Sequence, residues 1–529
     1  MPTDCISYQE SGYFTPLMND YLDQKTHLQS LYNRFPSNEN FAKQIAEKQV
    51  NYNDSYRKIL VDVLQKQYEK LSKSELVLAN IEALKEVNTF TITTGHQLNL
   101  FTGPLYFLYK IVSTINLAKE LKAKYPDKNF VPVYWMATED HDFEEINYFN
   151  FKGKKIRWNK KSTGPVGRLS TDGLDNVLKQ FEKDLGIGKN AAELKQLFES
   201  AYLKHSNLAQ ATRFLAHSLF AQYGLVIIDA DQKELKNIFA PYIKQELLTQ
   251  NSVQKVEETS TLLANYKIQV HPREINLFYI ENNLRERIIK ENNLYKINNT
   301  ELSFTTEEMI ELLEQSPEKF SPNVIMRPLY QEVILPNLCY IGGGGELAYW
   351  LQLKSYFDDC NITFPVLLLR NSVVLASKKQ SEKADRLQLS WNDLFKKTND
   401  LKNWIVKKES PLNLDFSEQK KFLKQQFDVL RTIATQTDPS FIGAVNAQEA
   451  KQIKGLNNLE KRLIQAEKKQ HADVLNRILA LQNELFPNGG LQERTANFSE
   501  FYLESGNLLI EKLVAVLAPL ENRFEIIVV

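Results

Sequence analysis

Two segments constrain the fold of this chain more than any others, because each ends a strand-like run in a cluster of polar residues. Residues 89–111 read TFTITTGHQLNLFTGPLYFLYKI, and residues 130–147 read FVPVYWMATEDHDFEEIN. A helical stretch at 104–125 separates them, so the order is strand, loop, helix, strand, loop. This is a βαβ unit, and open α/β sheets bind their ligands at the carboxyl ends of the strands. The pattern predicts an enzyme.

Composition excludes several classes of protein. The 529 residues include 65 basic and 65 acidic side chains, so whole-chain charge indicates neither nucleic acid nor an anionic membrane as a partner. No apolar run approaches the roughly 20 residues of a membrane span, and the N-terminus has no signal-peptide pattern. Cys5, Cys339 and Cys360 are scattered, which argues against a disulfide framework or a thiolate zinc site. We expect a cytoplasmic protein.

The spacing of apolar residues predicts four regions. Residues 1–85 are expected to form helices that pack on the core. From 86 to 380, strands alternate with helices as in a mostly parallel, doubly wound α/β sheet, with insertions at about 150–215 and 251–325. Residues 381–487 contain two long helical runs, 381–435 and 443–485, and are expected to form an antiparallel coiled coil. Residues 488–529 are expected to return to the core as a helix that begins at Ser499 and a terminal strand. The predicted strands are 89–93, 130–136, 225–228, 267–270, 277–280, 365–369, 372–376 and 524–529.

The first polar cluster lies between a strand and a Gly-Pro helix start. A histidine there can donate to a phosphate or carboxylate, or stabilise charge at a transferring phosphorus. The turn glycines and the helix-start amides can face an anion. A histidine that caps the loop or is satisfied in the core is an equally simple interpretation. The segment is not a P-loop, because G-x-x-x-x-G-K-[ST] is absent and Lys110 is too far into the helix. The candidate residues are Thr94, Gly95, His96, Gln97, Thr102 and Gly103.

The second cluster places four ionisable residues, Glu139, Asp140, His141 and Asp142, directly after a strand. Carboxylates beside a histidine fix its tautomer, which suits general-base chemistry on an amine or hydroxyl. The same cluster could hold a divalent ion. An acid-rich first turn of a helix would explain the carboxylates but not the histidine. Together with His96, we predict Asp140, His141 and Asp142 as catalytic residues.

The third candidate region is IGGGGELAYWLQ at 341–352. Its glycines allow a ligand to approach the main chain closely, and the helix that follows starts with free N–H groups. A flexible hinge is the alternative interpretation. Two arginines nearby are charge-assisted donors for carboxylate or phosphate. The candidate binding residues are Arg327, Gly343, Gly344, Glu346, Tyr349, Arg370 and Asn371, together with Glu139 of the second cluster.

In these segments the chain resembles the BshC family, which is assigned to the cysteine-adding step of bacillithiol biosynthesis. The resemblance is carried by TGHQLNLFTGPLYFLYK, VPVYWMATEDHDFEEIN, RPLYQEVILPNLCYIGGGGELAYWLQLK and LQERTANF, in order along nearly the whole chain. It implies a Rossmann-like core with connective insertions and a C-terminal coiled-coil domain. It also implies a ligase that joins L-cysteine to the amine of glucosaminyl-malate.

The family's fold is similar to that of nucleotidyltransferases and class I aminoacyl-tRNA synthetases. In that group a His-rich loop after the first strand handles the nucleotide phosphates, and His96 is the matching position. The resemblance therefore implies ATP, with Mg²⁺ as its companion ion. A clear second histidine and a Lys-Met-Ser-Lys-Ser loop are absent, so an adenylate and an acyl phosphate both remain open as the activated intermediate.

Two function classes follow. The favoured one is a ligase in which His96 and Gln97 bind phosphate or transition-state charge, while Asp140, His141 and Asp142 position and deprotonate the incoming ammonium. Which of His96 and His141 is the base remains open. The rival is a non-catalytic nucleotide- or thiol-binding protein that recruits partners through its coiled coil.

The helices at 381–485 carry more apolar surface than two antiparallel helices can bury against each other. We therefore predict a homodimer through these helices, since homo-oligomers usually close as two-fold dimers. A hairpin packed on its own core, in a monomer, is the alternative. The apolar stripe comprises Leu456, Leu463, Val474, Ile478 and Leu485, with Phe416, Phe422, Phe427, Leu430 and Ile433 on the partner helix.

Overall fold

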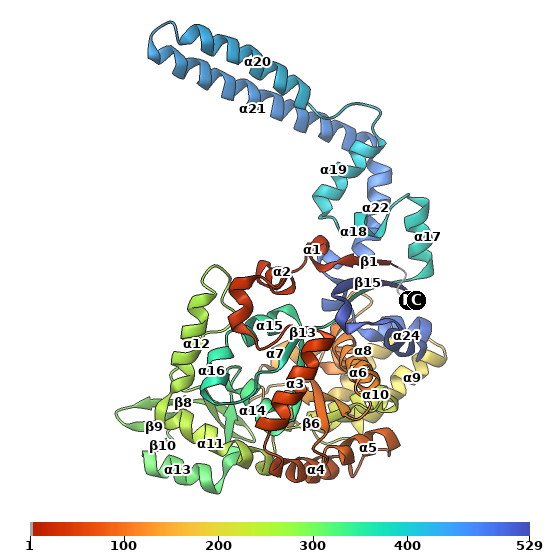
Figure 1. Cartoon of the computed structure of the whole chain (residues 1–529). Coiled ribbons are helices and arrows are strands. Elements are labelled where there is room, and N and C mark those ends of the chain that lie inside the picture. Colours follow the sequence, from red (N-terminus) through yellow and green to blue (C-terminus); the bar gives the residue numbers. More distant parts are fainter. Residues whose placement is uncertain (1–3) are drawn as a thin grey trace. The chain divides into compact units, whose positions relative to one another are not determined.

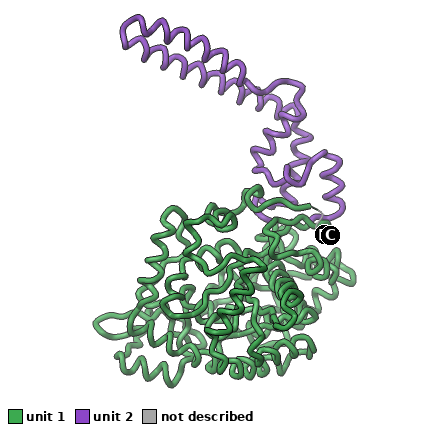
Figure 2. Tube along the Cα trace, viewed as in Figure 1, with its two compact units in different colours: residues 1–375, 492–529 green, residues 376–491 purple. Residues whose placement is uncertain are grey.

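The computed structural model describes residues 4–529, which divide into two compact units (Figure 2). One unit comprises the chain up to Leu375 together with Gln492–Val529, and the other comprises Ala376–Leu491. Among residues 4–529, no helix combines the length and the apolar character needed to cross a membrane.

The first unit is built on a five-stranded parallel sheet with the order β13-β12-β2-β3-β6 (Figure 1). In chain order this is the doubly wound Rossmann arrangement, so the predicted fold class is confirmed. The strand order reverses between β2 and β12, which opens a crevice at the carboxyl ends of these two strands. The strands are β2 (Thr89–His96), β3 (Asn129–Met136), β6 (Val226–Asp229), β12 (Asn337–Gly342) and β13 (Val366–Leu369).

Helices bury the sheet, which explains why its strands are apolar or threonine-rich throughout rather than alternating. Helix α6 (Tyr106–Lys124) packs across β2 and β3 and places Leu117 and Leu121 against Phe90 and Ile92. The helices predicted before residue 85 are present: α2 (Pro16–Leu22), α3 (Asn38–Asn51), α4 (Ser55–Tyr68) and α5 (Glu75–Ala83).

The second insertion forms a separate antiparallel sheet with the order β10-β9-β8-β7-β11. The predicted strand at 267–270 is wrong. The side chain of Gln352 accepts from the N–H groups of Gln269 and Val270 and donates to the Val270 carbonyl, so this backbone is satisfied without strand pairing. The elements are α12 (Asn251–Leu262), β7 (Leu277–Glu281), β8 (Leu284–Glu291), β9 (Leu294–Ile297), β10 (Ser303–Phe304), α13 (Thr306–Gln315) and β11 (Phe320–Pro322).

The remaining connections of this unit are mostly helical. The first insertion contains the hairpin of β4 (Tyr148–Phe151) and β5 (Lys154–Arg157), then α8 (Leu174–Leu185), α9 (Lys189–Phe198) and α10 (Leu208–Phe220). Helices α11 (Lys233–Thr249), α14 (Met326–Ile334), α15 (Gly344–Leu351) and α16 (Lys354–Asp359) complete the core.

The terminal strand β15 (Arg523–Val528) is the middle strand of a small sheet with β1 (Asp4–Ser7) and β14 (Ser372–Ala376).

The predicted helix that begins at Ser499 is wrong in its start and its length. Asn497 is the N-cap, and its side-chain oxygen accepts from the Ser499 N–H and hydroxyl at 3.0 and 2.6 Å. Gly506, at φ 57°, then separates α23 (Phe498–Ser505) from α24 (Leu508–Val516).

The second unit contains an antiparallel helical hairpin of α20 (Ser417–Ala434) and α21 (Pro439–Gln470), which lie side by side (Figure 1). Phe427, Ala434 and Val445 form its buried core. The predicted continuous helix over 381–435 is wrong, because the chain breaks at Gln388, at φ 52°, and again at the Ser410-Pro411 step. The other helices are α17 (Lys378–Arg386), α18 (Trp391–Phe395), α19 (Thr398–Glu409) and α22 (Ala472–Leu485).

Candidate active site

A cavity of about 910 Å³ lies at the carboxyl ends of the central strands, where the strand order reverses. Its position is the one at which doubly wound sheets bind ligands. The fold brings together residues that are up to 399 positions apart in the sequence, from Gly95 to Arg494. Of the predicted site residues, those that line the cavity are Gly95, His96, Gln97, Glu139, Asp140, His141, Asp142, Arg327, Gly343, Glu346, Tyr349 and Arg370.

Five predicted residues are not among those that line the cavity: Thr94, Thr102, Gly103, Gly344 and Asn371. Thr94 donates its hydroxyl to the carbonyl of Ile341 at 2.7 Å, which ties β2 to β12. Asn371 is bonded to Ser113 and Ala518. Gly103, at φ 63°, is required sterically, since a Cβ there would lie 2.6 Å from Cβ of Asn99. The interactions of these three residues support the loops that carry the site.

His96 is buried at the end of β2, where its ring packs against Tyr106 and Phe107. Among residues 4–529, Nε2 of the ring has no hydrogen-bond partner. Burial, and then the charge of Lys110, hold the pKa of His96 well below its ordinary value. The ring is therefore neutral, and its unpartnered Nε2 is free to bond a ligand.

Gln97 joins the two predicted clusters. Its Nε2 donates to Asp140 Oδ2 and to Glu145 Oε2, both at 3.0 Å. Asp140 Oδ1 in turn accepts from the His141 backbone N–H at 2.8 Å. The Gln97 amide is thus committed to carboxylates, and a phosphate would have to compete with them for this donor.

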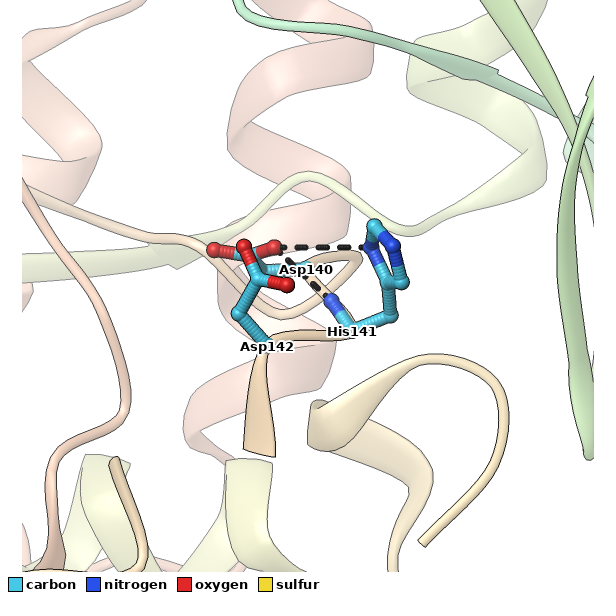
Figure 3. Close-up of side chains that lie close together, drawn as sticks. All are labelled: Asp140, His141 and Asp142. Atoms are coloured by element: carbon cyan, nitrogen blue, oxygen red, sulfur yellow. Dashed lines mark hydrogen bonds and ion pairs between the residues drawn. The ribbon is translucent and has the colours of Figure 1, made fainter. Parts of the chain in front are cut away.

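The side chains of Asp140, His141 and Asp142 lie close together beyond the end of β3 (Figure 3). His141 Nδ1 is 3.8 Å from Asp140 Oδ1, but Arg285 of the insertion sheet places Nη1 only 2.7 Å from the same nitrogen. Burial first, and then the Asp140 charge, raise the pKa of Asp142. A carboxylate with a raised pKa is a stronger base, so Asp142 suits proton abstraction better than an ordinary surface aspartate.

One potential ligand atom from each of these three residues lies within 4.8 Å of the others. However, the Arg285 guanidinium occupies the Nδ1 side of His141 and is attracted to Asp140, Glu139 and Asp142. A magnesium ion would have to displace this charge, so the arrangement does not fit a resident metal.

Glu139 faces a different set of partners. It pairs with Lys236 of α11, which also lies 3.1 Å from Asp231, and Asp231 accepts from Arg168 at 2.8 Å. Lys236 is almost fully buried. These ion pairs anchor the loop after β3 to the loop after β6.

Lys110 is too far into its helix to be a P-loop lysine, yet it lines the cavity. Its Nζ donates to the Gly95 carbonyl and pairs with Glu346 Oε2, each at 2.6 Å. Glu346 also accepts from the Gly343 N–H at 2.9 Å and the Tyr340 hydroxyl at 2.7 Å. Burial alone would raise the pKa of Glu346, but Lys110 and the Gly343 N–H outweigh it and hold this pKa below its ordinary value. The Gly343 amide of the glycine loop is therefore occupied by Glu346.

The arginines of the cavity fall into two groups. Arg370 is buried and its Nη2 pairs with Glu493 at 2.7 Å, but its Nε has no hydrogen-bond partner among residues 4–529. In contrast, five cavity-lining arginines have no carboxylate within 4.0 Å among residues 4–529. They are Arg273, Arg285, Arg287, Arg327 and Arg494. Arg327 lies near the rings of Trp135 and Tyr340 and donates to Gln331 and Tyr349. Unmatched guanidinium groups suit carboxylates or phosphates.

Sequence reasoning missed most of this cationic lining. Arg285 and Arg287 come from LRERIIK in the insertion, and Arg494 from LQERTANF. The arginine-rich composition of the first segment was the available signal, but surface arginines are common and their convergence depends on the fold.

Comparisons with known proteins place this arrangement in a family. The N-terminal Rossmann-like domain of bacillithiol biosynthesis BshC matches residues 1–371, and the C-terminal coiled-coil domain of the same family matches residues 373–529. The chain belongs to the BshC family. This confirms the resemblance drawn from the sequence, including the Rossmann-like core and the C-terminal coiled-coil domain.

Curated relatives match over nearly their full length. A Flavobacterium johnsoniae protein is 64% identical over 529 residues, which is 100% of both chains. A Cytophaga hutchinsonii protein is 40% identical over 516 residues, 97% of this chain and 96% of the relative. A Bacillus thuringiensis subsp. konkukian protein is 29% identical over 527 residues, 96% of each. All three relatives carry the name "Putative cysteine ligase BshC".

Proposed function

We propose that this chain is a cysteine ligase of bacillithiol biosynthesis, which joins the carboxylate of L-cysteine to the amine of glucosaminyl-malate. The observation that carries the proposal is a cavity in which five arginines without a carboxylate partner lie beside the carboxylates of Asp140 and Asp142. Both substrates bear carboxylates, which the arginines can bind. Both also bear amines, which carboxylates can bind and deprotonate. The names of the curated relatives support the same activity.

Condensation of a carboxylate with an amine is slow and unfavourable without activation, so the proposal includes ATP. When bound, the nucleotide would supply the activation of the cysteine carboxylate. The fit rests on this chain's own donors: guanidinium groups such as Arg327, which have no carboxylate partner, are suited to phosphates. Glu346 is held ionised by Lys110 and is 28% exposed, so it can accept from ribose hydroxyls.

The remaining residues have roles in proton transfer and positioning. Asp142, whose pKa is raised, removes the proton from the substrate ammonium. Asp140 is fixed by Gln97 and the His141 N–H, and it orients that ammonium. His96 is a neutral ring with an unpartnered Nε2, so it would contact a ligand as an uncharged hydrogen-bonding group.

The decisive experiment incubates the full chain with ATP, L-cysteine and glucosaminyl-malate, then measures nucleotide consumption and the amide product by mass spectrometry. We expect both signals to require both substrates. Asp142→Asn should reduce product formation by about 10²-fold or more. The matched control is Arg477→Ala, which removes an exposed charge outside the cavity. Nucleotide binding without any product would favour the rival, a non-catalytic binding protein.

The proposal extends to a homodimer formed through α20 and α21. Phe422, Val429 and Ile433 of α20 are 50–62% exposed, and Leu459 of α21 is 54% exposed. Ile478 and Leu485 of the predicted stripe are instead already buried. The exposed apolar residues on α20 and α21 are the surface that a second copy would cover.

Light scattering tests the dimer. We expect a mass of twice 61.3 kDa for the native chain at micromolar concentration, and a single-chain mass for the variant Phe422→Glu/Ile433→Glu. Lys424→Glu, at an exposed position of the same helix, is the control for added negative charge. A native chain that scatters as a monomer would remove the proposal.

A further inference from the structure

We propose that Arg285 is a positioning residue that fixes His141 in the tautomer with hydrogen on Nε2, so that His141 meets the substrate as a hydrogen-bond donor. The hydrogen bond and the tautomer follow from the geometry alone. Only the identity of the acceptor, an oxygen of a substrate carboxylate or phosphoryl group, rests on the proposed function.

Arg285 and His141 are in direct contact through their side chains. Arg285 Nη1 lies 2.7 Å from His141 Nδ1, a normal hydrogen-bond distance. A guanidinium group has only donors and keeps its protons in proteins, so Nδ1 must be the acceptor. Asp140 Oδ1, at 3.8 Å, is too far to accept a hydrogen from Nδ1. A neutral imidazole that accepts at Nδ1 carries its hydrogen on Nε2.

The guanidinium group of Arg285 is held in place by several other contacts. Its Nε donates to the Ser321 hydroxyl at 3.3 Å, and its Nη2 is 3.4 Å from the carbonyl of Pro322. The guanidinium carbon lies 3.9 Å from the centre of the Phe278 ring. Three strands of the insertion sheet, β7, β8 and β11, therefore hold the group that contacts His141. A donor held in this way costs little reorganisation when a substrate binds.

The tautomer of His141 determines which role in proton transfer it can take. A ring nitrogen that carries hydrogen cannot remove a proton, so His141 is excluded as the base while Arg285 holds it. It can instead stabilise negative charge on an oxygen as that charge develops. Proton removal then falls to Asp142, beside it (Figure 3). The insertion sheet thus separates the donor and acceptor functions of adjacent residues.

Nuclear magnetic resonance of the full chain, labelled with ¹⁵N-histidine, reads the tautomer without any turnover. We expect His141 to show a protonated Nε2 and an unprotonated Nδ1. Arg285→Ala should remove this preference and give averaged nitrogen shifts. Arg287→Ala is the matched control, because it removes the same charge two positions along the same strand without touching Nδ1. A native His141 with hydrogen on Nδ1, or on both nitrogens, would overturn the proposal.

Two amide substitutions test the donor role. His141→Gln places an N–H near the position of Nε2, whereas His141→Asn places its amide near Nδ1. With both variants shown to be folded by circular dichroism, we expect Gln to retain turnover within about tenfold and Asn to lose about 10²-fold. The reverse order would contradict the donor role. A chain without ligase activity would leave the tautomer result standing, so failure of the proposed function can be told apart from failure of this inference.

Discussion

His96 at the end of β2 and His141 beyond the end of β3 line the same cavity, but their surroundings differ. His96 is 8% exposed, whereas the His141 side chain is 41% exposed. Nε2 of His96 has no hydrogen-bond partner among residues 4–529, and burial holds the pKa of this ring low. His141 receives a hydrogen from Arg285 at Nδ1, so its Nε2 is a donor.

The difference shows that a residue type at a strand end does not define its chemical role. The rings that pack on His96, those of Tyr106 and Phe107, belong to α6, the helix that follows its own loop. The hydrogen-bond partner of His141 is 144 residues away, in the insertion sheet. Local packing buries the first ring, and a long-range contact sets the tautomer of the second. The following predictions test this contrast, beginning with the largest effect.

His96→Ala should reduce turnover by about 10²–10⁴-fold, because it removes a preorganised group from the crevice between β2 and β12. The product assay described above measures the loss. Circular dichroism should show that the fold is retained. Near-normal turnover would show that the buried histidine is structural and that the chemistry belongs to the β3 end alone.

Lys110→Met should destabilise the first unit by about 3 kcal/mol, the lower end of the range for a broken buried ion pair, since Glu346 keeps 28% exposure. The loss follows because Lys110 ties the end of β2 to α15 and its removal leaves the Glu346 charge unpaired. Urea unfolding provides the measurement. The double variant Lys110→Met/Glu346→Gln should recover part of the loss, and equal or greater instability in the double variant would argue against the pair.

Gln97→Leu should cost about 1–2 kcal/mol and loosen the connection between the two histidine loops, since Gln97 donates to both Asp140 and Glu145. The same urea assay applies, with turnover measured in parallel. If stability falls while turnover is unchanged, the alignment of the two strand ends is not needed for the reaction.

Lowering the pH should remove the contribution of His96 to the stability of the folded chain. In the unfolded chain a histidine binds a proton below about pH 6.5, but the pKa of folded His96 is held lower, so the unfolded state binds more protons in that window. Stability from this residue is therefore present above pH 6.5 and is lost as the pH falls, by at most about 1.4 kcal/mol per pH unit. The unfolding free energy should be measured from pH 7 to 5 for the native chain and for His96→Gln. The difference between the two should fall with this slope as the pH is lowered, and a constant difference would refute the prediction.

Much of the core was predictable because its signals are local. The predicted strand at 130–136 ends at Met136, as β3 does in the structure. The predicted strand at 89–93 ends three residues before β2, which continues to His96. The second predicted helical run, 443–485, also ends at Leu485 as predicted, but His471 interrupts it between α21 and α22. By contrast, serine and asparagine are both good N-cap residues, and Asn497 caps this helix two residues before Ser499, whose hydroxyl donates to the Asn497 side chain. Local propensity could not rank the two.

For the candidate site, the residue types came from the sequence and their pairings from the fold. The sequence alone marked His96 and the Asp140–Asp142 segment, because polar residues after buried strands must emerge at one edge of a parallel sheet. It could not show that Lys110 reaches Glu346, 236 residues away, or that Arg285 reaches His141. Those contacts depend on how an insertion and a helix pack on the sheet. Hydrogen-bond direction and proton position are properties of these pairs, and they are decided only when the tertiary structure brings both partners together.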